Sequence, residues 1–157
     1  MHIIVDGIFL RKLDFELLPE NIPENIDDGL SYGLEVKCHS YFSPEKDKLV
    51  QMVEFDLAHG VEKPPFKFQF TLQGQYHTEG EGTPSLEEFS KINAPAYMVP
   101  YARELIASMT SRISIIPTLV IPPINIFELL KDQDKNQDAE DEGTGDSPPL
   151  VSNIDEG

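Results

Sequence analysis

Apolar and polar residues alternate along the first half of the chain. In residues 66–73, phenylalanine or leucine occupies every second position with polar residues between, a period of two that predicts a strand with one apolar face. The same alternation predicts strands at about 31–42 and 47–59. A turn at 43–46, Ser-Pro-Glu-Lys, is expected to join these two strands into a hairpin.

A first strand is expected over about 2–16, with a bend or bulge near Gly7, where the phase of the apolar positions shifts. Four strands with short connections and alternating faces are typical of an antiparallel sheet with one solvent-facing side. The first half of the chain therefore predicts such a sheet.

A helical period replaces the alternation after the Gly- and Pro-containing segment 80–84. Apolar residues then recur at every fourth position: Tyr97, Tyr101, Leu105 and Met109. This spacing predicts an amphipathic helix over about 95–112. Asn93 is a candidate N-cap, and Pro100 is expected to kink the helix or to mark its start.

The end of the chain changes character twice. Prolines interrupt an apolar connector at 113–124, and a short helix is expected at about 125–131. Beyond it, the segment from Lys131 to the end contains nine acidic residues and two lysines and has no aromatic residue. Such a segment cannot offset the entropy cost of ordering itself. The sequence thus predicts one α+β domain at 1–131 and a disordered acidic tail at 132–157.

Charge and cysteine content narrow the function. The 157 residues include 28 acidic and 12 basic side chains, a formal net charge of -16. Nucleic acids and anionic membrane surfaces bind clustered Lys and Arg, so both kinds of partner are disfavoured. A single cysteine, Cys38, excludes an intramolecular disulfide and is typical of the cytoplasm. Neither a signal peptide nor a run of about 20 apolar residues occurs, so no membrane insertion is expected.

The sequence contains no recognisable catalytic constellation. Glycine-rich phosphate loops and the G-x-S-x-G elbow are absent, and Glu87 and Glu88 fit a polar helix face. The histidines lie without metal-ligand spacing: His2, His39, His59 and His77. We therefore expect no enzyme activity, no cofactor and no metal site.

Two loops are unusually apolar. Residues 17–26 and 113–123 carry prolines that break regular structure, yet both are rich in Ile and Leu. Loops of this composition either cover a core or line a binding groove, and composition alone favours core cover.

The run from Asn93 to Arg112 resembles the SecB protein-export chaperones. Their signature at this point is a Phe-Pro-Tyr-Ala-Arg-Glu helix with a Ser-Arg ending, followed by a Leu-Ala-Pro-Val-Asn-Phe connector. This chain has Val-Pro-Tyr-Ala-Arg-Glu at 99–104, Ser-Arg at 111–112 and Ile-Pro-Pro-Ile-Asn-Ile-Phe at 121–127. The order of four strands, long helix, apolar connector, last helix and acidic tail is also that of the family.

The resemblance implies an ATP-independent holdase that assembles as a dimer of dimers. Such a chaperone keeps unfolded preproteins competent for Sec-dependent export by holding them in long apolar grooves. The resemblance and the apolar loops together assign these groove positions: Phe66, Tyr101, Leu18, Ile22, Ile115, Leu119 and Phe127. A subunit interface of the homotetramer is expected on the long helix, at Tyr97, Arg103, Glu104, Leu105 and Met109.

The resemblance is weakest where a translocation partner would bind. SecB proteins present acidic residues on the solvent-facing side of the sheet to the basic, zinc-bearing tail of the SecA motor. Of those positions Glu16 alone is acidic here, and Lys12, Lys67 and Gln69 occupy the others. Weak SecA binding is expected. A SecB-like chaperone dedicated to one client, such as an antitoxin of a toxin-antitoxin system, is the main alternative, and an enzyme or small-ligand binder on this fold is a third.

Overall fold

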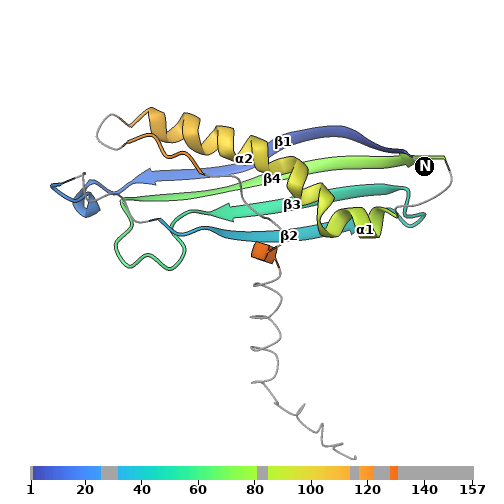
Figure 1. Ribbon diagram of the computed structural model, residues 1–157, viewed down its shortest axis with the longest axis horizontal. Helices are drawn as coiled ribbons and strands as arrows, with labels where there is room; N and C mark the ends of the chain where they lie inside the picture. Colours follow the sequence, from blue (N-terminus) through green and yellow to red (C-terminus); the bar gives the residue numbers. More distant parts are fainter. Residues whose placement is uncertain (1, 26–31, 81–84, 114–116, 122–127, 131–157) are drawn as a thin grey trace, which may run out of the picture.

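The computed structural model describes residues 2–25, 32–80, 85–113, 117–121 and 128–130. Its strands are β1 (His2–Leu17), β2 (Glu35–Phe42), β3 (Lys48–Asp56) and β4 (Phe66–Glu79). They form one antiparallel sheet in the order β1-β4-β3-β2 (Figure 1). The predicted sheet and its hairpin turn at 43–46 are confirmed, and Ser43 closes that turn by donating its backbone N–H to the Lys48 carbonyl.

Three strand boundaries differ from the sequence pattern. β3 ends at Asp56, earlier than the expected end at about 59. β4 continues beyond residue 73 to Glu79 because its last residues pair with both β1 and β3. β2 begins at Glu35, later than expected, since the preceding residues pair elsewhere. Gly33 makes an isolated parallel bridge to Ala58.

β1 contains two bulges. One lies between Val5 and Gly7, where an irregularity was predicted, and the other lies between Leu10 and Lys12, where none was foreseen. Each extra residue resets the alternation, so apolar residues stay on the side of the sheet that carries the helices. On that side Leu13 is paired with Phe70 across the strands.

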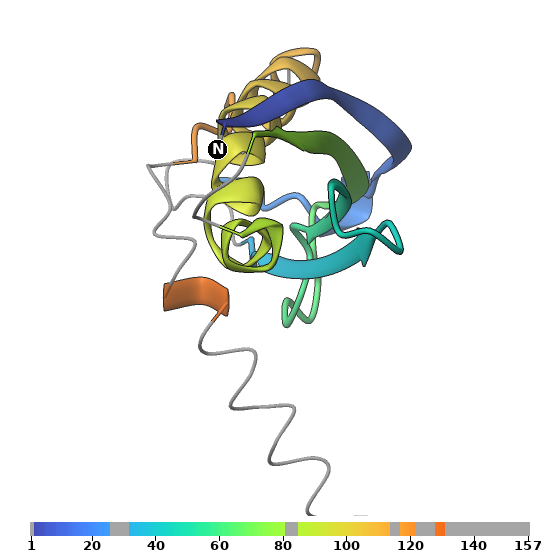
Figure 2. The same ribbon diagram turned by 90° about the vertical axis from the view of Figure 1, so that its right-hand side faces the viewer.

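Both helices cover one side of the curved sheet, as Figure 2 shows. α1 (Leu86–Lys91) begins at Ser85, whose hydroxyl accepts the Glu88 backbone N–H. α2 (Asn93–Ser111) crosses the sheet obliquely and bends on the way (Figure 1). A single-turn helix, η1 (Pro19–Asn21), follows β1.

The predicted long helix is confirmed, but Asn93 is not its N-cap. Asn93 is the first helical residue, and the cap position belongs to Ile92, which makes no side-chain capping bond. The physical reason is that α1 runs almost directly into α2, so no free start exists for Asn93 to cap. Pro100 lies inside the helix, where it lacks the N–H that would bond the preceding turn.

The core lies between the helices and the strands β3 and β4. Met98, Ala102 and Ile106 form one buried row of α2, while Phe55 and Phe70 stack across the sheet with ring centroids 4.8 Å apart. Residues 128–130 are helical, within the expected last helix, and the remainder of that helix at 125–127 and 131 lies outside the described residues, as does 132–157. Within the described part, no helix combines the length and apolar character needed to cross a bilayer.

Candidate functional site

The apolar side of β1 is only partly covered. Ile8 and Phe15 pack against the core from this edge strand, whereas other apolar residues on the same side stay exposed. Val5, Leu10 and Leu13 are 41%, 44% and 37% exposed, although their strand partners Tyr76, Leu72 and Phe70 are buried. Uncovered side chains of this size mark a surface that is available for contact.

Two tyrosines of α2 lie near Tyr76, the strand partner of Val5. Tyr97 and Tyr101 are each 52% exposed, on the flank of the helix next to its buried face. Tyr76 links them to β1, because it pairs with Val5 and stacks edge-on with Phe89, which in turn contacts Tyr97. Burial, together with smaller contributions from Tyr97 and Tyr101, raises the pKa of Tyr76 to about 12.

We call this set the apolar surface, defined by Val5, Leu10, Leu13, Tyr97 and Tyr101. Tyrosine contributes a large rigid ring and a polar tip, a combination that suits variable partners. The sequence identifies the helical part of this surface, Tyr97 and Tyr101, because apolar residues recur there at every fourth position. It misses the strand half because the second bulge of β1, between Leu10 and Lys12, interrupts the alternation.

The predicted groove residues occupy different environments. Tyr101 belongs to the apolar surface, whereas Phe66 is buried and packs against Phe15 and Phe68. Its ring forms part of the floor of the sheet, so any contribution of Phe66 to binding would be made from the core. Ile115 and Phe127 lie outside the described residues.

The loop after β1 is tied to the start of β4. Leu18 donates its backbone N–H to the Pro65 carbonyl at 2.8 Å, and the Asn21 side chain donates to the Pro64 carbonyl at 3.0 Å. Ile22 packs against the core, and both Leu18 and Ile22 are half-buried. This loop mainly covers the core, as its composition suggested.

The connector after α2 runs back along the helix. Leu119 donates its backbone N–H to the buried Thr110 hydroxyl at 2.9 Å, and Arg103 Nε donates to the Ile121 carbonyl at 3.0 Å. Leu119 packs on the core and Ile121 is buried, while Val120 is 68% exposed. The described connector is therefore core cover with one apolar side chain facing outward.

Of the residues expected at a subunit interface, some contact this chain's own core or connector and others are exposed. Leu105 and Met109 are half-buried against the chain's own core, and Arg103 donates a hydrogen bond to the connector. Tyr97 and Glu104 are exposed. On α2 these leave Tyr97, together with Tyr101, as the large apolar groups available to a second subunit.

The opposite side of the sheet, which we call the solvent face, is charged. Glu16 lies there across from Lys67, and Lys12 and Gln69 share the face, in agreement with the expected positions. The face also carries acidic residues that the resemblance had not assigned: Asp14, Glu35, Glu54 and Asp56. Two shallow cavities of ≈ 190 and ≈ 550 Å³ lie among them.

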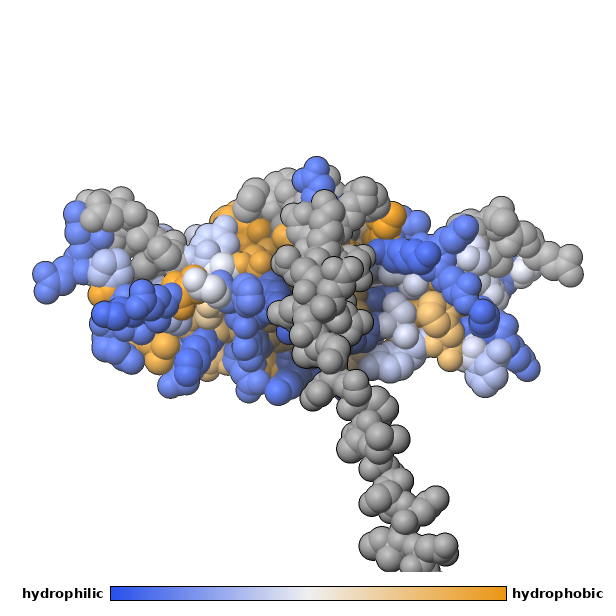
Figure 3. All heavy atoms as spheres, turned by 90° about the horizontal axis from the view of Figure 1, so that it is seen from below, coloured by the Kyte–Doolittle hydropathy of each residue, from blue (hydrophilic) through white to orange (hydrophobic). Residues whose placement is uncertain are grey.

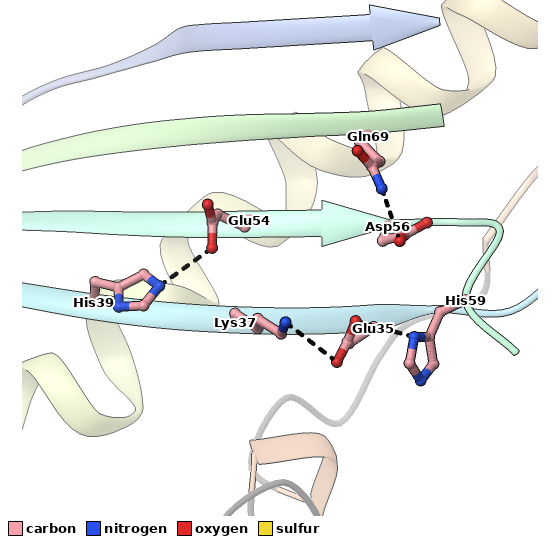
Figure 4. A network of polar contacts seen from close by, with 7 residues as sticks. All are labelled: Glu35, Lys37, His39, Glu54, Asp56, His59 and Gln69. Atoms are coloured by element: carbon pink, nitrogen blue, oxygen red, sulfur yellow. Dashed lines mark hydrogen bonds and ion pairs between the residues drawn. The ribbon is translucent and has the colours of Figure 1, made fainter. Parts of the chain in front are cut away.

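Ion pairs and hydrogen bonds link these side chains (Figure 4). His39 Nε2 lies 3.2 Å from Glu54 Oε2, and Lys37 Nζ lies 3.7 Å from Glu35 Oε1. At the end of the sheet, Glu35, Asp56 and His59 bring one ligand atom each within 4.8 Å of one another. No sequence spacing reveals this group, because the fold alone assembles it.

Towards the β2 edge the surface is mixed. Figure 3 views the molecule from that side, and hydrophilic residues predominate there with small groups of hydrophobic residues between them. Cys38, on the helix side of β2, is half-buried, and burial raises the pKa of its thiol to about 12, which disfavours the nucleophilic thiolate.

Comparison with solved structures identifies the fold. A SecB-like chaperone of Mycobacterium tuberculosis, in complex with a ChAD peptide from the HigA1 antitoxin, superposes with a TM-score of 0.63. The two chains are 16% identical, and the superposition covers 78% of this chain and 91% of that one. A protein of unknown function from Streptococcus agalactiae superposes with a TM-score of 0.46 at 14% identity, over 78% of this chain and 98% of that one. The fold is SecB-like, as the sequence resemblance implied.

Sequence comparison adds less. No family model matches the chain. An uncharacterized protein of Methanocaldococcus jannaschii is 29% identical over 68 residues, which cover 43% of this chain and 43% of that protein. The match thus spans less than half the length of that relative.

Proposed function

We propose that this protein is an ATP-independent holdase chaperone that binds unfolded polypeptide segments on the apolar surface. The observation that carries the proposal is the exposure of Tyr97 and Tyr101 on α2 and of apolar side chains on β1, on a SecB-like fold. An unfolded segment gains free energy by burying its own apolar residues against such side chains. No catalytic group and no nucleotide is needed for that exchange.

The first test measures aggregation of a chemically denatured model protein upon dilution. We expect suppression by stoichiometric amounts of the full chain, to the same extent with and without ATP and with and without a chelator. A requirement for ATP contradicts the proposal.

The second test locates the binding surface. The double variant Tyr97→Ala/Tyr101→Ala should bind a fluorescent unfolded client at least about tenfold more weakly, because a buried aromatic anchor contributes about 1–3 kcal/mol. Tyr41→Ala is the matched control, since Tyr41 is 60% exposed but lies on the solvent face. Equal losses in both variants, or no loss in a folded double variant, would place the client elsewhere.

Two client classes fit the proposal. Export of preproteins follows from the resemblance to SecB. The antitoxin peptide bound to the M. tuberculosis SecB-like chaperone favours the second class, a chaperone dedicated to one client such as an antitoxin. Affinity for SecA separates them, because an export chaperone must hand its client to the motor.

SecA binding is expected to be weak. Lys12 and Lys67 interrupt the acidic solvent face around Glu16, so attraction for a basic peptide depends mainly on the acidic tail at 132–157 and is screened by salt. Calorimetric titration of the zinc-bearing SecA tail peptide should give binding that weakens at physiological salt and is lost when the tail is deleted. Tight, salt-independent binding to the truncated protein would favour export instead.

We further propose that the protein acts in the cytoplasm as a homotetramer.

A further inference from the structure

Three metal-ligating side chains converge at one end of the solvent face. Glu35 is the first residue of β2, Asp56 is the last residue of β3, and the two are direct cross-strand partners. His59 follows in the connection to β4 and places Nδ1 3.0 Å from Glu35 Oε2. One ligand atom from each side chain lies within 4.8 Å of the others, and Figure 4 shows His59 turned towards Glu35.

The backbone holds this group in place. Asp56 accepts the Ala58 backbone N–H at 2.9 Å with one carboxylate oxygen and the Gln69 amide at 3.0 Å with the other. Gly33 donates its N–H to the Leu57 carbonyl and approaches so closely that a Cβ there would collide with the His59 carbonyl. The connection is thus held where it leads into His59, and the side chains meet without a large loss of backbone entropy.

The donor set fits a particular class of ion. One imidazole nitrogen with two carboxylates is a mixed set that borderline divalent metals such as Zn²⁺ accept, whereas Mg²⁺ and Ca²⁺ prefer oxygen donors alone. Each carboxylate oxygen of Asp56 keeps a lone pair beyond its hydrogen bond. The ≈ 190 Å³ cavity lined by Glu35 and Asp56 leaves room for water to complete the coordination.

We propose that Glu35, Asp56 and His59 bind a divalent metal ion of the zinc class. The ion would join the start of β2 to the connection between β3 and β4 and so act as a staple at this end of the sheet. Lys37 contacts the other oxygen of Glu35, so Glu35 coordinates through Oε2 alone. The site is on the face opposite the apolar surface, so holdase activity does not depend on it and each proposal can fail without the other.

Calorimetric titration of Zn²⁺ into the full, chelator-treated chain tests the site. We expect one ion per chain, and at least about tenfold weaker binding in His59→Ala and in Asp56→Asn. His39→Ala is the matched control, because His39 also pairs with a carboxylate on the solvent face but lies outside the group. Its affinity should equal that of the wild type.

A second measurement separates the site from general attraction of cations to an acidic chain. Zn²⁺ should raise the thermal midpoint of the wild type and of His39→Ala more than that of His59→Ala, because binding to the folded state stabilises it. Excess Mg²⁺ should not displace Zn²⁺. Unchanged Zn²⁺ affinity in folded His59→Ala and Asp56→Asn, or full displacement by Mg²⁺, overturns the proposal.

Discussion

At the scale of single residues, Thr110 joins α2 to the connector. Its buried hydroxyl donates to the Ile106 carbonyl at 2.8 Å and accepts the Leu119 backbone N–H at 2.9 Å. Thr110→Val keeps the shape but leaves the Leu119 N–H without its partner, so we expect a loss of about 1–3 kcal/mol in the free energy of unfolding, measured in urea. Ser111→Ala, which removes an exposed intrahelical bond to Ser108, should cost far less. Equal costs would contradict this role.

His77 makes stability depend on pH. A hydrogen bond to Asp6, 2.8 Å from Nδ1, and the nearby Glu79 raise the pKa of His77 above its ordinary value of 6.5. The folded state therefore favours the charged ring, and this contribution is fully present below pH 6.5 and is lost as pH rises through the raised pKa. The pair is solvent-accessible, so the effect is small.

The difference in thermal midpoint between wild type and His77→Gln should accordingly shrink as the pH rises from about 6 to about 8. NMR titration gives a direct measurement, in which Asp6→Asn should return the pKa of His77 towards its ordinary value. A pKa at or below the ordinary value in the wild type would show that the pair does not form.

Gln51 marks a limit of sequence reasoning at this scale. It interrupts the apolar alternation of β3, yet it is fully buried on the helix side of the sheet, across from Gly74. Ser40 donates to its carbonyl oxygen at 2.8 Å, while the space over Gly74 is filled by Met98 and Tyr76. A polar residue at a position where the alternation calls for an apolar one can mean that the strand ends there, or that the residue is buried and hydrogen-bonded. The sequence alone does not distinguish the two cases.

At the scale of elements, Gly33 fixes where the connection after β3 lies. A methyl group at Gly33 meets the backbone of His59, which cannot move aside cheaply, whereas one at Gly7 meets nothing within 4 Å. We expect Gly33→Ala to destabilise the fold by about 1–3 kcal/mol and to weaken Zn²⁺ binding, with little effect from Gly7→Ala. Denaturant unfolding of both variants measures these changes in the free energy of unfolding. Similar stability of the two would mean that the close approach is not required.

The helices and strands were largely predictable from the sequence, but which side of each one faces the core was not. The period of four in α2 predicts a helix, but two neighbouring rows are apolar, and the sequence does not say which faces the sheet. In the structure the row through Ala102 is buried because a small residue allows close approach, which leaves the row through Tyr97 and Tyr101 at the edge. Likewise, one bulge of β1 was visible at Gly7, while the second, before Lys12, became clear from strand register alone.

At the scale of the whole molecule, the two candidate sites differ in how far sequence reasoning reaches them. The apolar surface follows in part from local periodicity and from the resemblance at 99–104. The metal-ligating group depends on the pairing of Glu35 with Asp56 and on the bridge that positions His59, which are long-range contacts with no local signal. Spacing rules detect ligands that share one element, and here each ligand comes from a different one.

The apolar surface also bears on assembly, because a second subunit and a client would both bury it. Each chain carries a formal charge of -16, so copies repel one another at long range while their apolar side chains attract at contact. Salt screens the repulsion and leaves the apolar contact intact. Raising the salt concentration should therefore strengthen self-association, although it weakens the expected SecA contact.

Light scattering at micromolar concentration tests this with a chain of 17.7 kDa. We expect about four times that mass at physiological salt and a smaller mean mass at low salt. Tyr97→Glu places another negative charge on the exposed flank of α2 and should shift the population towards smaller species. Tyr41→Glu adds the same charge on the solvent face and should leave the mass unchanged. A 17.7 kDa species at every salt concentration would contradict a tetramer built through α2 and would leave the apolar surface entirely to the client.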